Sequence, residues 1–212
     1  MAVLELDDVS VTYRSAAGPV PAVRGVSLTV DTGSSLGLAG ESGSGKTTVT
    51  STVLRLLPKS ATVTGQVLLD GEDVLTMRWG RLRAVRWATA SVVFQGAMHA
   101  LNPVQRVGHQ IAEPIRLHEK SVSEPTARAR VGDLLEQVGL PSRVAQSYPH
   151  QLSGGQKQRV MIAMALACGP RLIVADEPTT ALDVMVQQQV LEVLAERVRD
   201  LGLAMVFISH DL

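Results

Sequence analysis

The residues with the clearest chemical potential lie in a glycine-rich segment, positions 40–47, which reads GESGSGKT. This segment fits the pattern G-x-x-x-x-G-K-[ST], in which backbone N–H groups surround the phosphates of a nucleotide. Glycine permits positive φ angles and a close approach of the backbone to an anion. Lys46 would supply a mobile positive charge for the β- and γ-phosphates, and the Thr47 hydroxyl would bind Mg²⁺.

The flanking sequence favours this interpretation over a flexible Gly/Ser linker. Residues 35–39 are typical of a short buried strand, and residues 47–57 are typical of a helix that ends before Pro58. A strand, a glycine-rich loop and a helix in this order place phosphates at the positive N-terminal end of the helix.

Two acidic residues follow a second apolar segment late in the chain. Residues 171–175 predict a fully buried strand that runs into Asp176 and Glu177. Ligands of parallel α/β proteins bind at the carboxyl ends of the strands, so we expect both acids beside the glycine-rich loop. Asp176 would hold Mg²⁺, directly or through water, and Glu177 would orient and deprotonate the water that attacks the γ-phosphate. The alternative, a solvated acidic turn before Pro178, is less favoured because the loop is present.

His210 ends a third predicted buried strand, at residues 203–209, where it would face the same nucleotide. A side chain that donates to the γ-phosphate there could stabilise a transition state. An ordinary surface histidine is the alternative.

Residues 152–156, which read LSGGQ, predict a second helix with an anion-binding N-terminus. Ser153 and Gln156 stand at capping-box spacing before the apolar run 160–168. Because one nucleotide pocket does not need two such sites, we expect this one to serve a nucleotide held by another molecule. A helix cap with two turn glycines is the alternative.

The elements that must position these residues alternate between strands and helices. Further strands are predicted at 3–13, 26–30, 65–71 and 91–94, with a loop at 15–19 and an amphipathic helix at 184–200. Such alternation predicts a parallel α/β sheet. Five prolines punctuate the helical stretches of residues 96–150, which indicates an inserted helical region.

Composition sets broad limits on the class of protein. The 212 residues predict one domain, and the 20 basic and 20 acidic residues give no global field for nucleic acid or an anionic membrane. The N-terminus lacks the basic region of a signal peptide, and the longest apolar run is too short to span a bilayer. The single cysteine, Cys168, is expected to be a buried, inert thiol in a reducing compartment. These features predict a soluble cytosolic protein.

Arginines and tryptophans gather on a predicted helix: Arg78, Trp79, Arg81, Arg83, Arg86 and Trp87. A stacked surface for nucleic acid is one interpretation, but a solvated helix face is favoured.

Taken in order, these segments resemble an ATP-binding cassette. Residues 152–156 are similar to the family signature, and the strand ending in Asp176 and Glu177 is similar to its Walker B strand. Further matches are Tyr13 with the aromatic residue that stacks on adenine, Gln95 with the Q-loop glutamine, residues 181–183 with the D-loop, and His210 with the switch histidine. The resemblance covers the whole chain.

The resemblance implies an α/β fold of the P-loop NTPase (RecA-like) type. It has a parallel sheet, an N-terminal antiparallel β-subdomain and an inserted helical subdomain. A single cassette domain would occupy residues 1–212, with the nucleotide-binding core in 1–95 and 169–212 and the helical subdomain in 96–168. Because the chain stops two residues after His210, where the family continues, a C-terminal truncation is expected.

ATP and Mg²⁺ are the cofactors that the resemblance implies. The catalytic residues would be Lys46, Glu177 and His210, and the metal ligands would be Thr47, Gln95 and Asp176. Nucleotide contacts would come from Tyr13, Gly40, Ser42, Gly43, Ser44, Gly45, Lys46, Thr47, Thr48, Gln95, Ser153, Gly154, Gly155, Gln156 and Asp183. Two domains would close head to tail on two ATP molecules, with residues 153–155 of one domain capping the γ-phosphate held by the other.

Residues 94–103, 148–151 and 179–184 are similar to the ATPase subunits of dipeptide, oligopeptide and nickel importers. This implies an ATPase that lies peripherally on the cytoplasmic face of the membrane and drives uptake of peptides or nickel through permease subunits. Its other partners would be an identical or paralogous ATPase domain and an extracytoplasmic substrate-binding protein, and it would not bind nucleic acid. The alternative is a non-transport cassette acting on ribosomes or DNA, but no tandem cassette, coiled-coil insertion or basic linker is present. A P-loop kinase or GTPase leaves 152–156 and His210 unexplained.

Overall fold

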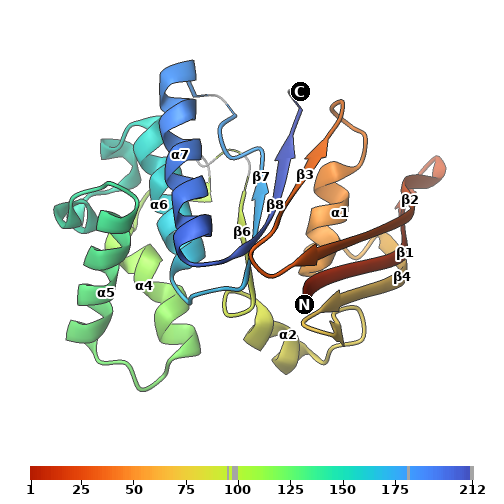
Figure 1. The fold of residues 1–212 in the computed structure, drawn as a ribbon, viewed down its shortest axis with the longest axis horizontal. Helices are drawn as coiled ribbons and strands as arrows, with labels where there is room; N and C mark the ends of the chain where they lie inside the picture. The colour runs from red at the N-terminus through yellow and green to blue at the C-terminus, as the bar shows by residue number, and fades with distance from the viewer. Residues whose placement is uncertain (95, 97–99, 181, 211–212) are drawn as a thin grey trace.

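The computed structural model of the protein describes residues 1–94, 96, 100–180 and 182–210. Two four-stranded sheets form its centre. In Figure 1 the antiparallel sheet lies on one side of the parallel sheet, and most of the helices lie on the other side. This arrangement confirms the predicted α/β fold with an N-terminal antiparallel β-subdomain and an inserted helical region.

The antiparallel sheet has the strand order β2-β1-β4-β5. Its strands are β1 (Ala2–Ser15), β2 (Gly18–Asp31), β4 (Ala61–Leu69) and β5 (Glu72–Asp73). The predicted loop at 15–19 is wrong, because β1 and β2 pair from Ser15 and Gly18 onward as a tight hairpin. β2 contains Pro19 and Pro21, and it is an edge strand, where a missing N–H is tolerated.

The parallel sheet has the order β3-β8-β7-β6. Its strands are β3 (Ser35–Ala39), β6 (Ala90–Val93), β7 (Leu172–Asp176) and β8 (Ala204–Ser209). The register pairs Ala39 with Ser209, and Asp176 with Ile208. The carboxyl ends of β3, β7 and β8 therefore meet at one edge of the sheet.

β7 is packed against a hydrophobic core on each of its two faces, which holds this edge of the sheet in place. Ile173 and Ala175 face the core under the helical region, whereas Leu172 and Val174 face the core that packs against α1 and the antiparallel sheet. All five residues of β7 are buried, as expected for a parallel strand covered on both faces.

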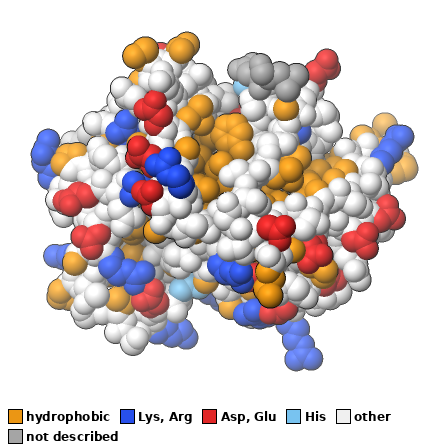
Figure 2. Space-filling model, viewed as in Figure 1, with side chains coloured by type: hydrophobic (Ala, Val, Ile, Leu, Met, Phe, Trp, Pro, Cys, Tyr) orange, Lys and Arg blue, Asp and Glu red, His pale blue; other side chains and the backbone are white. Residues whose placement is uncertain are grey.

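β3 is less buried than its sequence predicted. It is an edge strand, with Leu36 and Leu38 half-buried and the alternate residues exposed. Figure 2 shows hydrophobic side chains gathered near the middle of this face, over the region of β3 and β8, with charged side chains around them. Position in the sheet, which local sequence does not specify, sets this exposure.

The helices are α1 (Lys46–Val53), α2 (Trp79–Val85), α4 (Val107–His118), α5 (Glu124–Gln137), α6 (Gly154–Leu166) and α7 (Val184–Asp200), with 3₁₀ turns at Ser142–Gln146 and Pro149–Gln151. α1 ends about one turn earlier than predicted, because Leu54 leaves the helical conformation and Arg55 has a φ of +49°. Among the described residues, no helix combines the length and apolar character needed to cross a membrane.

Two of the clustered arginines make contacts within the chain. The Arg86 guanidinium lies 5.3 Å from the centre of the Trp79 ring and donates to the Leu54 carbonyl oxygen at 2.7 Å. Arg81 donates through Nε to Glu72 at 2.9 Å. These contacts tie α2 to the end of α1 and to β5.

Cys168 is partly exposed, not buried as predicted. Desolvation is still sufficient to raise the pKa of its thiol to about 11, with a smaller contribution from the Glu119 charge. The thiol is therefore protonated at neutral pH, which agrees with the expected lack of reactivity.

Candidate nucleotide-binding site

A cavity of about 450 Å³ opens at the edge of the parallel sheet where β3, β7 and β8 end. It is lined by Ala22, Ser42, Gly43, Gly45, Lys46, Thr47, Thr48, Glu177, Thr180 and His210. The fold thus brings together the glycine-rich loop, the acidic segment after β7 and the histidine after β8.

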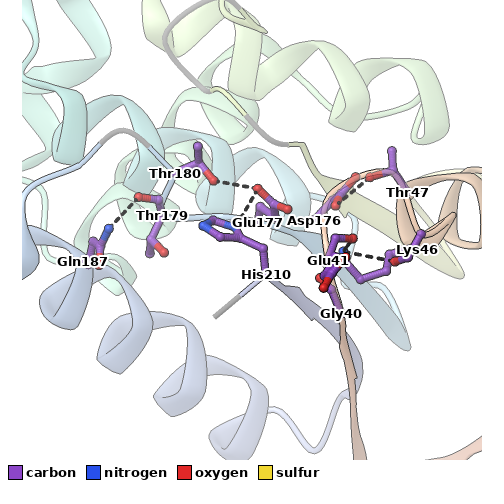
Figure 3. A network of polar contacts seen from close by, with 11 residues as sticks. Gly40, Glu41, Lys46, Thr47, Asp176, Glu177, Thr179, Thr180, Gln187 and His210 are labelled. Carbon is purple, nitrogen blue, oxygen red and sulfur yellow. Dashed lines mark hydrogen bonds and ion pairs between the residues drawn. The ribbon is translucent and has the colours of Figure 1, made fainter. Parts of the chain in front are cut away.

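The glycine-rich loop has a backbone that other residues would not allow. Gly45 has a φ of +97°, and a Cβ at this position would lie 2.5 Å from the carbonyl oxygen of Ala22. Lys46 begins α1, and its Nζ donates to the carbonyl oxygens of Gly40 at 2.6 Å and Glu41 at 2.7 Å (Figure 3). The loop therefore encloses the ammonium group at the positive end of the helix.

Thr47 and Asp176 join the start of α1 to the end of β7. The Thr47 hydroxyl donates to Asp176 Oδ1 at 3.3 Å. Only 5% of Asp176 is exposed. Burial raises the pKa of its carboxyl group, the Thr47 hydrogen bond lowers it, and the neighbouring Glu177 charge raises it.

This pair could hold a Mg²⁺ ion. A hydroxyl and a carboxylate are the hard oxygen ligands that Mg²⁺ prefers, and Mg²⁺ takes its other ligands from water and substrate phosphates. The described part of the chain contains no cluster of three or more His, Cys, Asp or Glu residues suited to a metal. The residues thus fit a metal bound together with a nucleotide. Gln95, the third predicted ligand, lies outside the described residues.

Glu177 occupies a left-handed backbone conformation directly after β7, with a φ of +44°. Its N–H donates to the Ile208 carbonyl oxygen at 3.2 Å, which anchors it to β8. The N–H of Thr180 donates to the Glu177 carbonyl oxygen at 3.2 Å and closes a turn with Pro178 in its second position, where proline is favoured. Such a φ costs ~1–3 kcal/mol in a residue other than glycine and is concentrated at functional sites.

The Glu177 carboxylate contacts two residues through one oxygen. Its Oε2 lies 3.2 Å from His210 Nδ1 and accepts a hydrogen bond from the Thr180 hydroxyl at 3.0 Å (Figure 3). His210 was predicted here from its place after a buried strand. Thr180 was not predicted, although a turn with Pro178 in second position is a signal that residue 180 folds back over residue 177.

Tyr13 lies beside the first turn of α1. It is half-buried on β1, and its hydroxyl is 3.3 Å from the Thr48 hydroxyl. Tyr13 does not line the cavity itself. Its predicted contact with an adenine ring remains a prediction.

Segment 152–156 forms the predicted helix N-terminus. Ser153 Oγ accepts from the Gln156 N–H at 3.3 Å, and Gln156 Oε1 accepts from the Ser153 N–H at 3.0 Å, which confirms the capping box at the start of α6. Gly155 packs against α7 so closely that an added Cβ would overlap the Val186 side chain.

None of the described residues lining the cavity comes from 152–156. α6 belongs to the core on one face of the parallel sheet, and α1 belongs to the core on the other face (Figure 1). Asp183 is also outside the cavity, where its carboxylate caps α7 by accepting from the Val186 N–H at 3.0 Å. The predicted nucleotide contacts therefore fall into two groups: those at the cavity, and those at the starts of α6 and α7 outside it. Ala181, in the predicted D-loop, lies outside the described residues.

The parallel sheet, the glycine-rich loop at α1 and the acids after β7 define a P-loop nucleotide-binding protein. Residues 23–180 match the family model described as "ABC transporter", and the chain belongs to this family.

Relatives and solved structures agree with this assignment. The chain is 46% identical over 214 residues to the probable D,D-dipeptide transport ATP-binding protein DdpD of Escherichia coli, a match that covers 99% of this chain and 65% of DdpD. It is 46% identical to the oligopeptide transport ATP-binding protein OppD of Mycobacterium tuberculosis, covering 99% of this chain and 34% of OppD. The chain thus spans less than two thirds of either relative.

Among solved structures, the fold is similar to the dimeric ATP-binding cassette MJ0796 in a post-hydrolysis state bound to ADP and Pi. The TM-score is 0.87 at 31% identity, and the match covers 98% of this chain and 88% of MJ0796. It is also similar to cbiO1 of Clostridium perfringens, part of the transporter complex cbiONQ, with a TM-score of 0.79 at 26% identity. That match covers 99% of this chain and 79% of cbiO1.

Proposed function

We propose that this chain binds and hydrolyses ATP to drive uptake of peptides, or of nickel, through a membrane permease. The observation that carries the proposal is the convergence of Lys46, Thr47, Asp176, Glu177 and His210 around one cavity edge. The names of DdpD and OppD, both transport ATP-binding proteins, support the peptide assignment and give no support to action on ribosomes or DNA.

Each residue has a defined task in this proposal. Lys46 and the N–H groups of the loop bind the β- and γ-phosphates, because these residues line the cavity. Thr47 and Asp176, with Gln95, would hold Mg²⁺, which would supply positive charge beside the phosphate oxygens. Glu177 accepts the proton of the attacking water, and His210 contacts the γ-phosphate from the end of β8.

A second ATPase domain completes the site. Ser153, Gly154 and Gly155 lie outside the cavity of their own chain, so they would cap the nucleotide of a partner cassette, identical or paralogous. The dimeric form of MJ0796 supports this arrangement. Within the chain, residues 1–95 and 169–212 would be the nucleotide-binding core, and 96–168 the helical subdomain that meets the permease at the cytoplasmic face of the membrane.

The test uses the protein isolated from its native membrane, with ATP turnover and co-purifying proteins as readouts. The proposal expects ATP hydrolysis that requires Mg²⁺ and integral permease subunits in the isolated complex, together with a substrate-binding protein that stimulates hydrolysis. Isolation with ribosomes, or turnover that Glu177→Gln leaves unchanged, contradicts it.

A further inference from the structure

The turn after β7 carries a residue that contacts the Glu177 carboxylate and that the proposed mechanism has not used. Thr180 lies in the cavity wall, and its hydroxyl donates to Glu177 Oε2 at 3.0 Å. The backbone of the same turn is closed by the hydrogen bond from the Thr180 N–H to the Glu177 carbonyl oxygen. Side chain and backbone of Thr180 therefore both bond to Glu177.

A side chain of α7 also holds this turn in place. The side-chain amide of Gln187 donates to the carbonyl oxygen of Thr179 at 3.3 Å and to that of Leu182 at 3.2 Å. In Figure 3 Gln187 reaches from its helix to Thr179 on one side of the turn, while Thr180 points to Glu177 on the other side. One half-buried amide thus spans the segment between Glu177 and α7.

We propose that Thr180 is a positioning residue for Glu177, and that Gln187 is a positioning residue for the turn that carries Thr180. The inference rests on the proposed function, in which Glu177 is the general base. A base must stand within hydrogen-bond reach of the water it deprotonates, and a misplacement of 1 Å can cost about 10²-fold in rate. A threonine hydroxyl is uncharged throughout the working pH range, so it restrains the carboxylate independently of pH.

The experiment compares Thr180→Val, which removes the hydroxyl at nearly constant volume, with Thr180→Ser, which retains it. For Thr180→Val we expect kcat to fall by about 10–10²-fold with KM for ATP unchanged, because the base is displaced and the phosphate contacts are not. Thr180→Ser should recover most of this loss. Wild-type kcat in Thr180→Val overturns the proposal, and so does a rise in KM without a fall in kcat.

A double mutant separates positioning from a general structural role. In the Glu177→Gln background, measured in long single-turnover incubations, Thr180→Val should cause no further loss, because the group that it positions has been removed. An equal further loss shows that Thr180 does not act through Glu177 and overturns the inference alone. Full activity of Glu177→Gln overturns the proposed function and this inference with it.

Gln187→Leu tests the outer contact. It removes both amide hydrogen bonds, and kcat should fall by about 3–10-fold with KM for ATP unchanged, because the turn is loosened and not lost. The matched control is Gln188→Leu, one position along the same helix, where an exposed amide donates to Glu192 Oε1 at 2.9 Å. Equal effects of the two variants contradict a specific role for Gln187.

Discussion

The N-termini of α1 and α6, which the sequence predicts to be anion-binding sites, differ in how they are capped. α1 begins after Gly45, which has no side chain to cap the first turn, and its end faces the 450 Å³ cavity. α6 begins after Ser153, whose capping box with Gln156 occupies the backbone N–H groups of these two residues, and its end does not line that cavity.

From this difference we propose two modes of anion recognition. The α1 end has a lysine and the Thr47–Asp176 pair within one chain, so it can hold a triphosphate with its metal. The α6 end has a capped backbone and an exposed serine, which would suit one face of a contact completed by a second molecule. The following predictions test this division.

The largest effect should come from the α1 site. Glu177→Gln should reduce ATP turnover by about 10²–10⁴-fold while ATP binding persists, because only the general base is removed. It should also trap a closed dimer in ATP. Lys46→Ala should instead weaken ATP binding. Turnover assays, ATP titration and size-exclusion chromatography measure these outcomes, and equal ATP affinities of the two variants would contradict the assignment.

The α6 site should respond to charge. Ser153→Asp preserves the helix cap but adds a negative charge, and two like charges about 4 Å apart repel by ~1–4 kcal/mol, so turnover should fall roughly tenfold or more. Ser153→Asn is the matched control, since asparagine caps equally well without charge. Gly155 is unsuitable for this purpose, because any side chain there overlaps Val186 within the chain.

Mixing then tests whether the site is shared between chains. Lys46→Ala and Ser153→Asp chains should each have little activity, and their mixture should recover part of it, because one site combines an intact loop with an intact Ser153. If the natural partner is a different cassette, the two changes are divided between the partners. A mixture as inactive as its components places each site within a single chain.

A smaller effect is expected at the edge of the α1 site. Tyr13→Ala should weaken ATP binding by ~1–3 kcal/mol, the contribution of base–aromatic stacking. Tyr13→Phe removes the hydroxyl contact with Thr48 but retains the ring, so affinity should stay close to wild type. Isothermal titration with ATP measures both. Unchanged affinity in Tyr13→Ala assigns Tyr13 to packing alone.

The smallest predicted effect is on the thermal stability of the protein without nucleotide or metal. Burial raises the pKa of Asp176, so its ionised form is disfavoured in the folded state. Asp176→Asn should therefore raise Tm at pH 7 without nucleotide or metal, because the neutral amide avoids the cost of burying a charge. This gain should shrink as pH falls through the raised pKa toward 3.8, because the carboxyl then becomes neutral in both states. A gain that persists at low pH contradicts this cause.

The sequence by itself determined the local structural features of the site. The glycine-rich loop before α1, the capping box at Ser153 and the buried strand before Asp176 are each specified by residues within a few positions of one another. Capping and turn preferences act over that range, so the spacing of residue types was sufficient to predict these features. Prediction from local sequence failed where the position of a strand in the sheet decides its exposure or its pairing. The examples are the half-exposed β3 and the hairpin that replaced the predicted loop at 15–19.

The meeting of these features at one edge of the sheet was predicted, because ligands bind at the carboxyl ends of parallel strands. The strand order and the contacts between separate elements were decided only by the tertiary structure. The order β3-β8-β7-β6 places Lys46, Asp176 and His210 at one edge, and it depends on packing on both faces of the sheet. The bond of Thr180 to Glu177, the reach of Gln187 to the turn and the packing of Gly155 on Val186 likewise join side chains whose spacing carries little signal. Side-chain contacts between separate elements follow from how those elements pack, and the pattern within one element does not contain that information.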